Sequence, residues 1–316
     1  MFVGHALFAF ALVAVVAARR EWTPSRALAV GGVAGAFAAV PDVDIAYALV
    51  GLVGAHGGPV ALASSFWATG SVVHRAVTHS ILVAPVVAAA VGLWVASGRP
   101  DGRHRSLAAL ALLALSGLVA VAAVESGVLG GAMMALFGVA ALVVAEAVRR
   151  RTTLAPGYVA AAALVGLVSH PFGDLFTGTP PAMLYPVDAS LVAHRLVLAS
   201  DPTLHLLAAF GVELAVVWSA VAVFCSLAGL RPSVEPRATL GAGYAASVFL
   251  IPAPTLDLSY PFVFSVLAVG SLGVLPGIRL RSASPIAAPD RTTALVTGLT
   301  AVTVAWLAYG VAYLAL

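Results

Sequence analysis

The sequence predicts an all-α protein, a polytopic transmembrane helical bundle of about ten helices. Of its 316 residues 61% are hydrophobic and only 9% are charged, whereas about a quarter are charged in a typical soluble domain. The mean hydropathy of +1.05 agrees with a chain that lies largely in lipid. Apolar runs long enough to approach or cross the hydrocarbon core recur along the whole chain.

The apolar runs predict helices in the following order: 2–18, 26–40, 81–97, 107–124, 128–148, 157–170, 204–230, 238–252, 260–278 and 293–316. The first run has no basic residue before it, and Arg19 and Arg20 follow it, which is the reverse of a secretory signal. We therefore expect a retained helix. Five glycines and a proline interrupt the region 45–73, which indicates short or re-entrant helices.

Arginine clusters predict the orientation, because basic residues in short loops stay on the cytoplasmic side. The clusters are Arg19/Arg20/Arg26, Arg99/Arg103/Arg105, Arg149/Arg150/Arg151, Arg231/Arg237 and Arg279/Arg281/Arg291. Ten crossings place all five on one side and both termini outside. The sequence therefore predicts a multi-pass protein of the plasma membrane.

Histidine and aspartate gather on the opposite, extracytoplasmic side. The groups are His5, Pro41-Asp42-Val43-Asp44, the segment from His74 to Ser80, and His170 with Asp174. His170 and Asp174 are four residues apart, so on a helix they share one face, which is a metal-ligand spacing. Ionisable groups are costly in a membrane without a partner, and four distant segments bring them to one face. This convergence predicts a metal site there, with His5, Asp42, His74, His79, His170 and Asp174 as candidate ligands and the choice between His74 and His79 left open.

Several of these residues have alternative roles. Asp42 and Asp44, if extended, point the same way and reach one cation, or one of them caps the next helix. His74 and His79 are about 140° apart on a helix, so they share an ion only if their segment begins as a loop or if two ions bind. Arg75 either binds a phosphate through its planar fork or pairs with an acid.

The remaining histidines are weaker candidates. His56 lies in a glycine-rich turn, and His104 lies in a basic cytoplasmic loop where we expect it to be solvated. His194, with Arg195, and His205 are on the outer side and are accessory ligands or substrate contacts in this interpretation.

Other chemistries are excluded by composition. All sixteen basic residues other than histidine are arginine, so no lysine is available as a base or Schiff-base former. Cys225 is the single cysteine, which excludes an internal disulfide and a cysteine-based metal site. Ligands limited to His, Asp and Glu suit zinc or manganese-like ions. Zinc-protease, nucleotide-binding and serine-hydrolase motifs are absent from the sequence.

Together these motifs resemble the YdjM-type membrane-bound metal-dependent hydrolases, over roughly residues 1–186. That family is thought to be distantly similar to zinc-dependent phospholipase C. The resemblance implies that His170, Asp174, Asp42 and either His74 or His79 surround one ion. It also implies that His5 shares Asp174 with a second. The further H-x-x-x-E/D pair of the phospholipases is missing, since His205 and Glu213 are eight apart, so we do not expect three metals.

We therefore expect residues 1–186 to form a metal-dependent hydrolase-like domain and 187–316 an additional helical bundle. One or two divalent ions, zinc foremost, would activate water against a phosphoester or lipid-linked substrate, with Asp44 as base and Arg75 on the phosphate. The expected partners are membrane lipids and a small-molecule or lipid-linked substrate, not nucleic acid. The alternatives are a transporter of metal ions or protons, and a structural protein with an inert metal site.

Overall fold

The computed structural model describes residues 2–98, 104–275, 277–278, 286–287 and 290–316. Except for the two-residue strands β1 (Gly277–Ile278) and β2 (Ile286–Ala287), its regular elements are helices, so the predicted all-α fold is confirmed. The chain divides into two compact units. The first runs to Leu196 and includes Ser219–Phe224, and the second comprises Val197–Trp218 and Cys225–Leu316. The predicted domain boundary at residue 186 stays a prediction.

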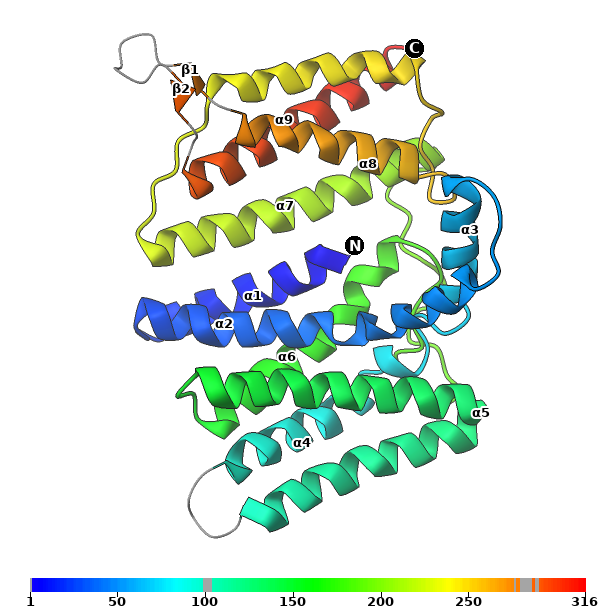
Figure 1. The fold of residues 1–316 in the computed structure, drawn as a ribbon, viewed down its shortest axis with the longest axis vertical. Helices are drawn as coiled ribbons and strands as arrows, with labels where there is room; N and C mark the ends of the chain where they lie inside the picture. Colours follow the sequence, from blue (N-terminus) through cyan, green and yellow to red (C-terminus); the bar gives the residue numbers. More distant parts are fainter. Residues whose placement is uncertain (1, 99–103, 276, 279–285, 288–289) are drawn as a thin grey trace. The chain divides into compact units, whose positions relative to one another are not determined.

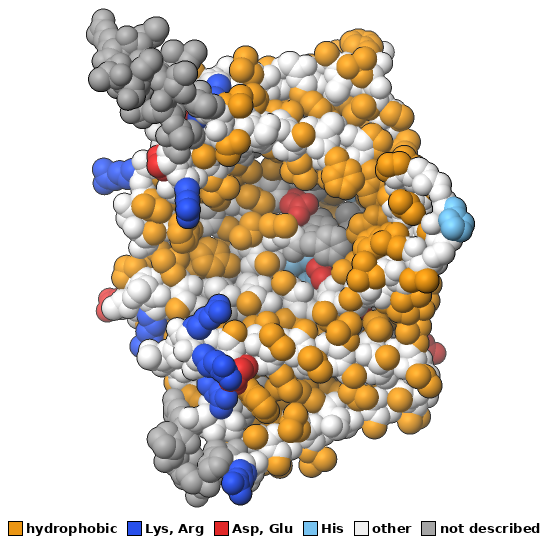
Figure 2. Space-filling view, in the orientation of Figure 1, with side chains coloured by type: hydrophobic (Ala, Val, Ile, Leu, Met, Phe, Trp, Pro, Cys, Tyr) orange, Lys and Arg blue, Asp and Glu red, His pale blue; other side chains and the backbone are white. Residues whose placement is uncertain are grey.

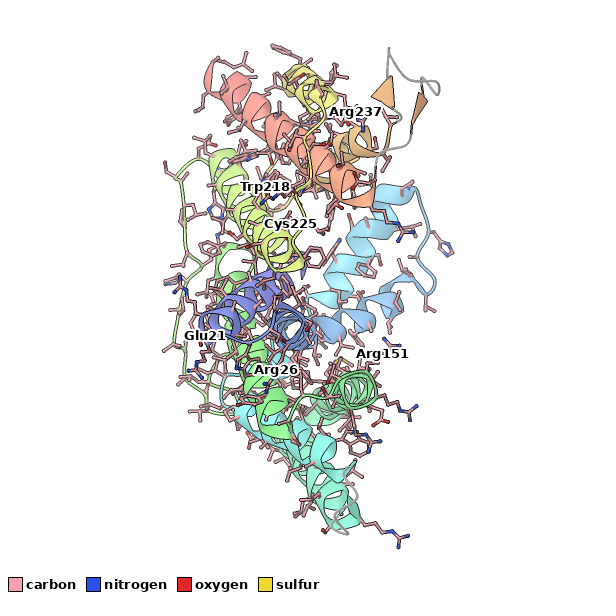
Figure 3. The ribbon with its side chains drawn as sticks, turned by 90° about the vertical axis from the view of Figure 1, so that its left-hand side faces the viewer. Glu21, Arg26, Arg151, Trp218, Cys225 and Arg237 are labelled. Carbon is pink, nitrogen blue, oxygen red and sulfur yellow. The ribbon has the colours of Figure 1, made fainter. Side chains whose placement is uncertain are left out.

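The elements follow the predicted order, with 3₁₀ helices labelled η (Figure 1). Unit 1 contains α1 (Phe2–Arg19), α2 (Pro24–Ala39), η1 (Pro41–Leu52), α3 (Pro59–Gly70), η2 (Val77–His79), α4 (Val83–Ser97), α5 (His104–Arg151), α6 (Pro156–Gly173) and η3 (Asp174–Phe176). Most of α7 (Pro202–Ala228) lies in unit 2, with η4 (Pro236–Phe249), α8 (Tyr260–Val269), η5 (Gly270–Val274) and α9 (Arg291–Leu314). The single cysteine, Cys225, is buried on α7 (Figure 3).

Five helical segments of the described chain are long and apolar enough to cross a membrane. They are Pro24–Leu52, Arg105–Arg151, Pro156–Phe176, Pro202–Ala228 and Arg291–Leu314. Three shorter apolar helices accompany them. The ten crossings and the outer termini stay predictions, and Arg99, Arg103, Arg279 and Arg281 lie outside the described residues.

Local sequence explains where the helices begin and break. Proline occupies the first turn of α2, α3, α6 and α7, where its missing N–H is not needed. The two helices predicted at 107–124 and 128–148 are the two arms of α5. They meet at Ser126 and Gly127, and Gly127 has a φ of 68°, which a glycine adopts without a steric penalty.

The extended conformation, one of the two alternatives for Asp42 and Asp44, is not the one that the structure has. Val40 keeps right-handed helical angles, and Pro41 is tolerated in the first turn of η1, so the chain continues as a 3₁₀ helix. Residues two apart on such a helix point in different directions, so the Asp42 and Asp44 carboxylates do not face the same group. The prediction of short helices in 45–73 is confirmed by η1 and α3, with a glycine-rich turn between them.

Glycines let α1, α2 and α6 approach closely. A Cβ on Gly35 of α2 would lie 2.8 Å from the Ala6 carbonyl oxygen of α1. A Cβ on Gly166 of α6 would lie 2.3 Å from the Ala34 oxygen and 2.8 Å from the Ala38 nitrogen of α2. Small residues at helix contacts are the usual means of packing helices in membranes.

Replacing Gly166 with alanine should therefore force α6 away from α2. We expect an overpacking cost of about 1–3 kcal/mol, measured as a lower unfolding temperature of the protein in detergent. The matched control is Gly157→Ala in the same helix, because a Cβ there meets no atom within 4 Å. Equal unfolding temperatures for the two variants would contradict the close α2–α6 contact.

Helix direction in unit 1 separates the arginines at the ends of α1 and α5 and at the start of α2 from the histidine and aspartate residues. Arg19 ends α1, Arg26 begins α2, and Arg149–Arg151 end α5 just before α6. His5 lies in the first turn of α1, and His170 lies in the last turn of α6. In the lower part of Figure 2, where α4, α5 and α6 lie, the basic side chains gather at the left edge. These arginines thus lie at the helix ends opposite His5 and His170, and the side of the membrane that each end faces stays a prediction.

Candidate metal centre

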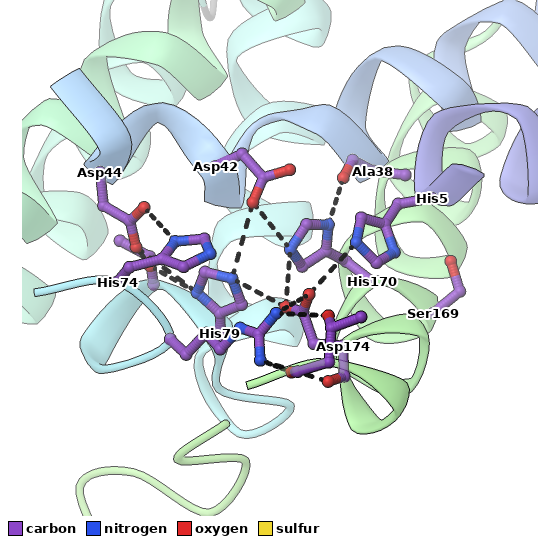
Figure 4. Close-up of polar contacts among 12 residues, drawn as sticks. His5, Ala38, Asp42, Asp44, His74, His79, Ser169, His170 and Asp174 are labelled. Carbon is purple, nitrogen blue, oxygen red and sulfur yellow. Dashed lines mark hydrogen bonds and ion pairs between the residues drawn. The ribbon is translucent and has the colours of Figure 1, made fainter. Parts of the chain in front are cut away.

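All six predicted metal ligands come together in unit 1 (Figure 4). Three overlapping groups have donor atoms within 4.8 Å of one another. These are His5/Asp42/His170, Asp42/His74/His79 and His79/His170/Asp174. The first turn of α1, the start of η1, the segment 74–79 and the end of α6 supply them. Four segments that are distant in sequence therefore meet at one cluster.

Four donor atoms form the centre of this cluster. His79 Nε2 lies 3.3 Å from Asp174 Oδ2 and 3.8 Å from Asp42 Oδ1. His170 Nε2 lies 3.4 Å from Asp42 Oδ1 and 3.6 Å from Asp174 Oδ2. Ligands about 2.0–2.1 Å from a tetrahedral zinc ion are separated by roughly 3.3 Å. The four distances are thus close to the separation of two ligands on one zinc ion.

These four atoms and the second oxygen of Asp42 are buried and have no hydrogen-bond partner among the described residues. They are Asp42 Oδ1 and Oδ2, His79 Nε2, His170 Nε2 and Asp174 Oδ2. Burying unpaired carboxylate oxygens is expensive unless a cation compensates their charge. The residues present therefore fit a divalent ion at this position.

The His170 ring is oriented by the backbone of α2. Its Nδ1 lies 2.6 Å from the carbonyl oxygen of Ala38, near the helix end where carbonyls lack an intrahelical partner. A carbonyl only accepts, so Nδ1 carries the proton and donates it. In the neutral imidazole the Nε2 lone pair then faces Asp42 and Asp174, which is the tautomer that a metal ligand needs.

The His79 ring is oriented by a chain through Thr78 to Asp44. The Thr78 hydroxyl donates to Asp44 Oδ2 at 2.7 Å, and its oxygen lies 2.8 Å from His79 Nδ1. Since the single hydroxyl proton goes to Asp44, Nδ1 of His79 donates to the hydroxyl oxygen. Burial lowers the pKa of the His79 imidazole, which favours the neutral form that binds cations. Its Nε2 lone pair also faces the centre.

Asp44 holds His74 as well. Its Oδ1 lies 2.9 Å from His74 Nδ1, and its side chain is fully buried. The rings of His74 and His79 are 5.1 Å apart, because residues 71–76 form turns before η2. The loop that the sequence required for both histidines to reach one place is thus present. No side-chain hydrogen bond of Asp44 caps η1.

His5 flanks the centre on the other side. Its Nε2 lies 3.4 Å from Asp174 Oδ1, and its ring centroid lies 4.2 Å from that of His170. A Cβ on Gly173 would lie 2.3 Å from His5 Nδ1, so only glycine leaves room for this ring. Gly173 is a site residue that our reading of the sequence missed, although its place between His170 and Asp174 was a signal.

Arg75 forms the ion pair that was one of its two predicted roles. Its Nη2 donates to Asp174 Oδ1 at 3.0 Å and to Thr177 Oγ1 at 2.9 Å, while Nη1 bonds the carbonyls of Thr177 and Thr179. The backbone of Arg75 has a φ of 68°, a strained value for a residue with a side chain. Arg75 therefore fixes Asp174 and the turn after it, and phosphate binding stays a prediction.

The weaker candidates lie outside the three ligand groups found in the described chain. His56, His194 and Arg195 are exposed in unit 1. His205 belongs to unit 2, where its Nδ1 accepts a hydrogen bond from the Leu198 N–H at 3.1 Å. The side chain of His104 lies outside the described residues.

The fold and the cluster define a helical membrane protein with a buried His/Asp group that could hold a metal ion. The chain matches the family model of the YdjM inner membrane protein over residues 1–237, three quarters of its length. It belongs to that family, and the match extends through α7, beyond the predicted limit near residue 186. Comparison with curated proteins and with solved structures gave no match. The similarity to phospholipase C stays a prediction.

Proposed function

We propose that the protein is a membrane-embedded metal-dependent hydrolase whose ion lies among Asp42, His79, His170 and Asp174. The observation that carries this proposal is the set of buried donor atoms that lack a hydrogen-bond partner among the described residues and lie 3.3–3.8 Å from their neighbours in the set. When bound, a divalent ion such as zinc polarises the scissile bond and lowers the pKa of water toward neutrality.

Hydrolysis is favoured over an inert structural site because the cluster offers more than four donors. His5 and His74 flank the central set, and Asp42 Oδ2 is a further oxygen without a hydrogen-bond partner among the described residues. The Asp42 and His74 side chains are 11% and 14% exposed, whereas His79 and His170 have no exposed side-chain surface. A substrate would therefore approach from the Asp42 and His74 side. A second ion would be held by flanking residues.

The protein residues around the ion act by orientation. Both oxygens of Asp44 are engaged, so it holds His74 directly and His79 through Thr78. This assigns Asp44 an orienting role in place of the predicted general base. Arg75 keeps one Asp174 oxygen occupied, so that the other is directed at the ion.

The substrate we propose is a phosphoester, and specifically one linked to a lipid. Metal ions match the charge of phosphate, and the cluster lies at the helix ends opposite Arg19, Arg26 and Arg149–Arg151. Under the positive-inside rule these ends face the extracytoplasmic surface. A site at that surface is accessible to lipid headgroups.

The test is a substrate screen with purified protein in detergent. Phosphomonoesters, phosphodiesters and phospholipids are offered to the protein as purified, after chelation, and after Zn²⁺ or Mn²⁺ is restored. We expect turnover of one class that chelation removes and metal restores. Metal flux into proteoliposomes with no turnover in any class would instead favour transport, the alternative that the cluster also permits.

A further inference from the structure

An apolar groove lies between α4 and the second arm of α5, at the helix ends away from the metal cluster. Its volume is about 310 Å³, and it is lined by Trp94, Val139, Leu142, Val143 and Glu146. Val139 and Val143 are 58% and 62% exposed, so the groove is open along one side. It belongs entirely to unit 1.

The polar end of the groove carries an excess of positive charge. Glu146 accepts from Trp94 Nε1 at 3.0 Å, from Arg149 Nη2 at 2.8 Å and from Arg150 Nε at 2.5 Å. The single negative charge of Glu146 is thus shared by two of three consecutive arginines, which leaves a net positive charge. The Arg150 side chain is 76% exposed, and Arg151, labelled in Figure 3, is exposed at the end of α5.

We propose that this groove binds an anionic phospholipid, with one acyl chain along Val139 and Val143 and the phosphate at Arg150 and Arg151. The apolar lining suits a hydrocarbon chain, and guanidinium groups suit a phosphate because two N–H groups bind two oxygens. Trp94 lies where the apolar and polar parts meet, the usual place of tryptophan at a membrane surface. Net positive charge selects a lipid with net negative charge over a zwitterionic one.

The headgroup contact is tested by native mass spectrometry of the full chain with phosphatidylglycerol and phosphatidylcholine. We expect the wild type to prefer phosphatidylglycerol, and Arg150→Gln/Arg151→Gln to lose roughly tenfold or more of that preference. The matched control is Arg19→Gln/Arg20→Gln, an exposed pair at the end of α1. Equal preference in wild type and Arg150→Gln/Arg151→Gln, or equal loss in both double variants, would overturn the proposal.

The groove itself is tested by Val143→Trp, which fills it, beside Val128→Trp, an 89% exposed position of α5 outside the lining. We expect only Val143→Trp to weaken phosphatidylglycerol binding. Undiminished binding in Val143→Trp, or displacement of the lipid by free glycerol phosphate, would show that no acyl chain is held there and would overturn the proposal. None of these changes touches the metal cluster, so the outcome is independent of the proposed hydrolysis.

Discussion

Purified wild-type protein is expected to hold about one or two divalent ions per chain, and the His170→Ala/Asp174→Ala variant none. These residues supply two of the four central donors, and each of the other two lies within 4 Å of at least one of them. Two remaining donors do not complete a tetrahedral site. Elemental analysis of protein purified in detergent measures the difference directly.

The control for metal content is His56→Ala/His194→Ala, which removes two exposed imidazoles outside the cluster. It should retain the wild-type amount of metal. If both double variants keep the metal, or if the wild type contains none after divalent ions are supplied, the cluster is a structural pairing of His and Asp.

Turnover is expected to fall to background in His170→Ala and by only about 10–100-fold in Thr78→Val. His170 presents a lone pair to the centre, whereas Thr78 only orients His79, and residues that orient a ligand typically contribute a factor of that size. Initial rates on the substrate found by the screen, at saturating metal, measure both variants. A Thr78→Val rate equal to wild type would show that the contact with Asp44 does not orient His79.

The meeting of the His and Asp residues was predictable because it needs only helix direction. Each of His5, Asp42 and His170 lies at an end of an apolar run, and the arginines at the other ends fix which ends coincide. The alternation of apolar runs and arginine clusters therefore indicates that these three residues lie at the same end of the helical bundle. The breaks at Gly127 and before α3 were likewise visible as glycine and proline.

The geometry within the cluster was not predictable in the same way. The contact between His170 and Ala38 joins residues 132 apart, and only packing of α6 on α2 brings them together. The extended alternative for 42–44 does not occur because Pro41 begins a 3₁₀ helix there instead of ending the helical conformation. Whether Arg75 pairs with Asp174 or is left for a phosphate could not be predicted. Its contacts depend on the turn at 174–179, which has no periodic sequence pattern.

The long sequence separation of the candidate ligands also determines when the proposed ion could be acquired. His79 and His170 are separated by all of α4, α5 and most of α6, and His170 is oriented only once α6 rests on α2. His5 and Asp42 are near the N-terminus and are inserted first. Until α6 packs on α2, the His5 imidazole and the Asp42 carboxylate are therefore not part of a complete site. Under the proposed function, metal capture would then come late in biogenesis, and a filled centre would mark a unit 1 whose helices have already reached their final neighbours.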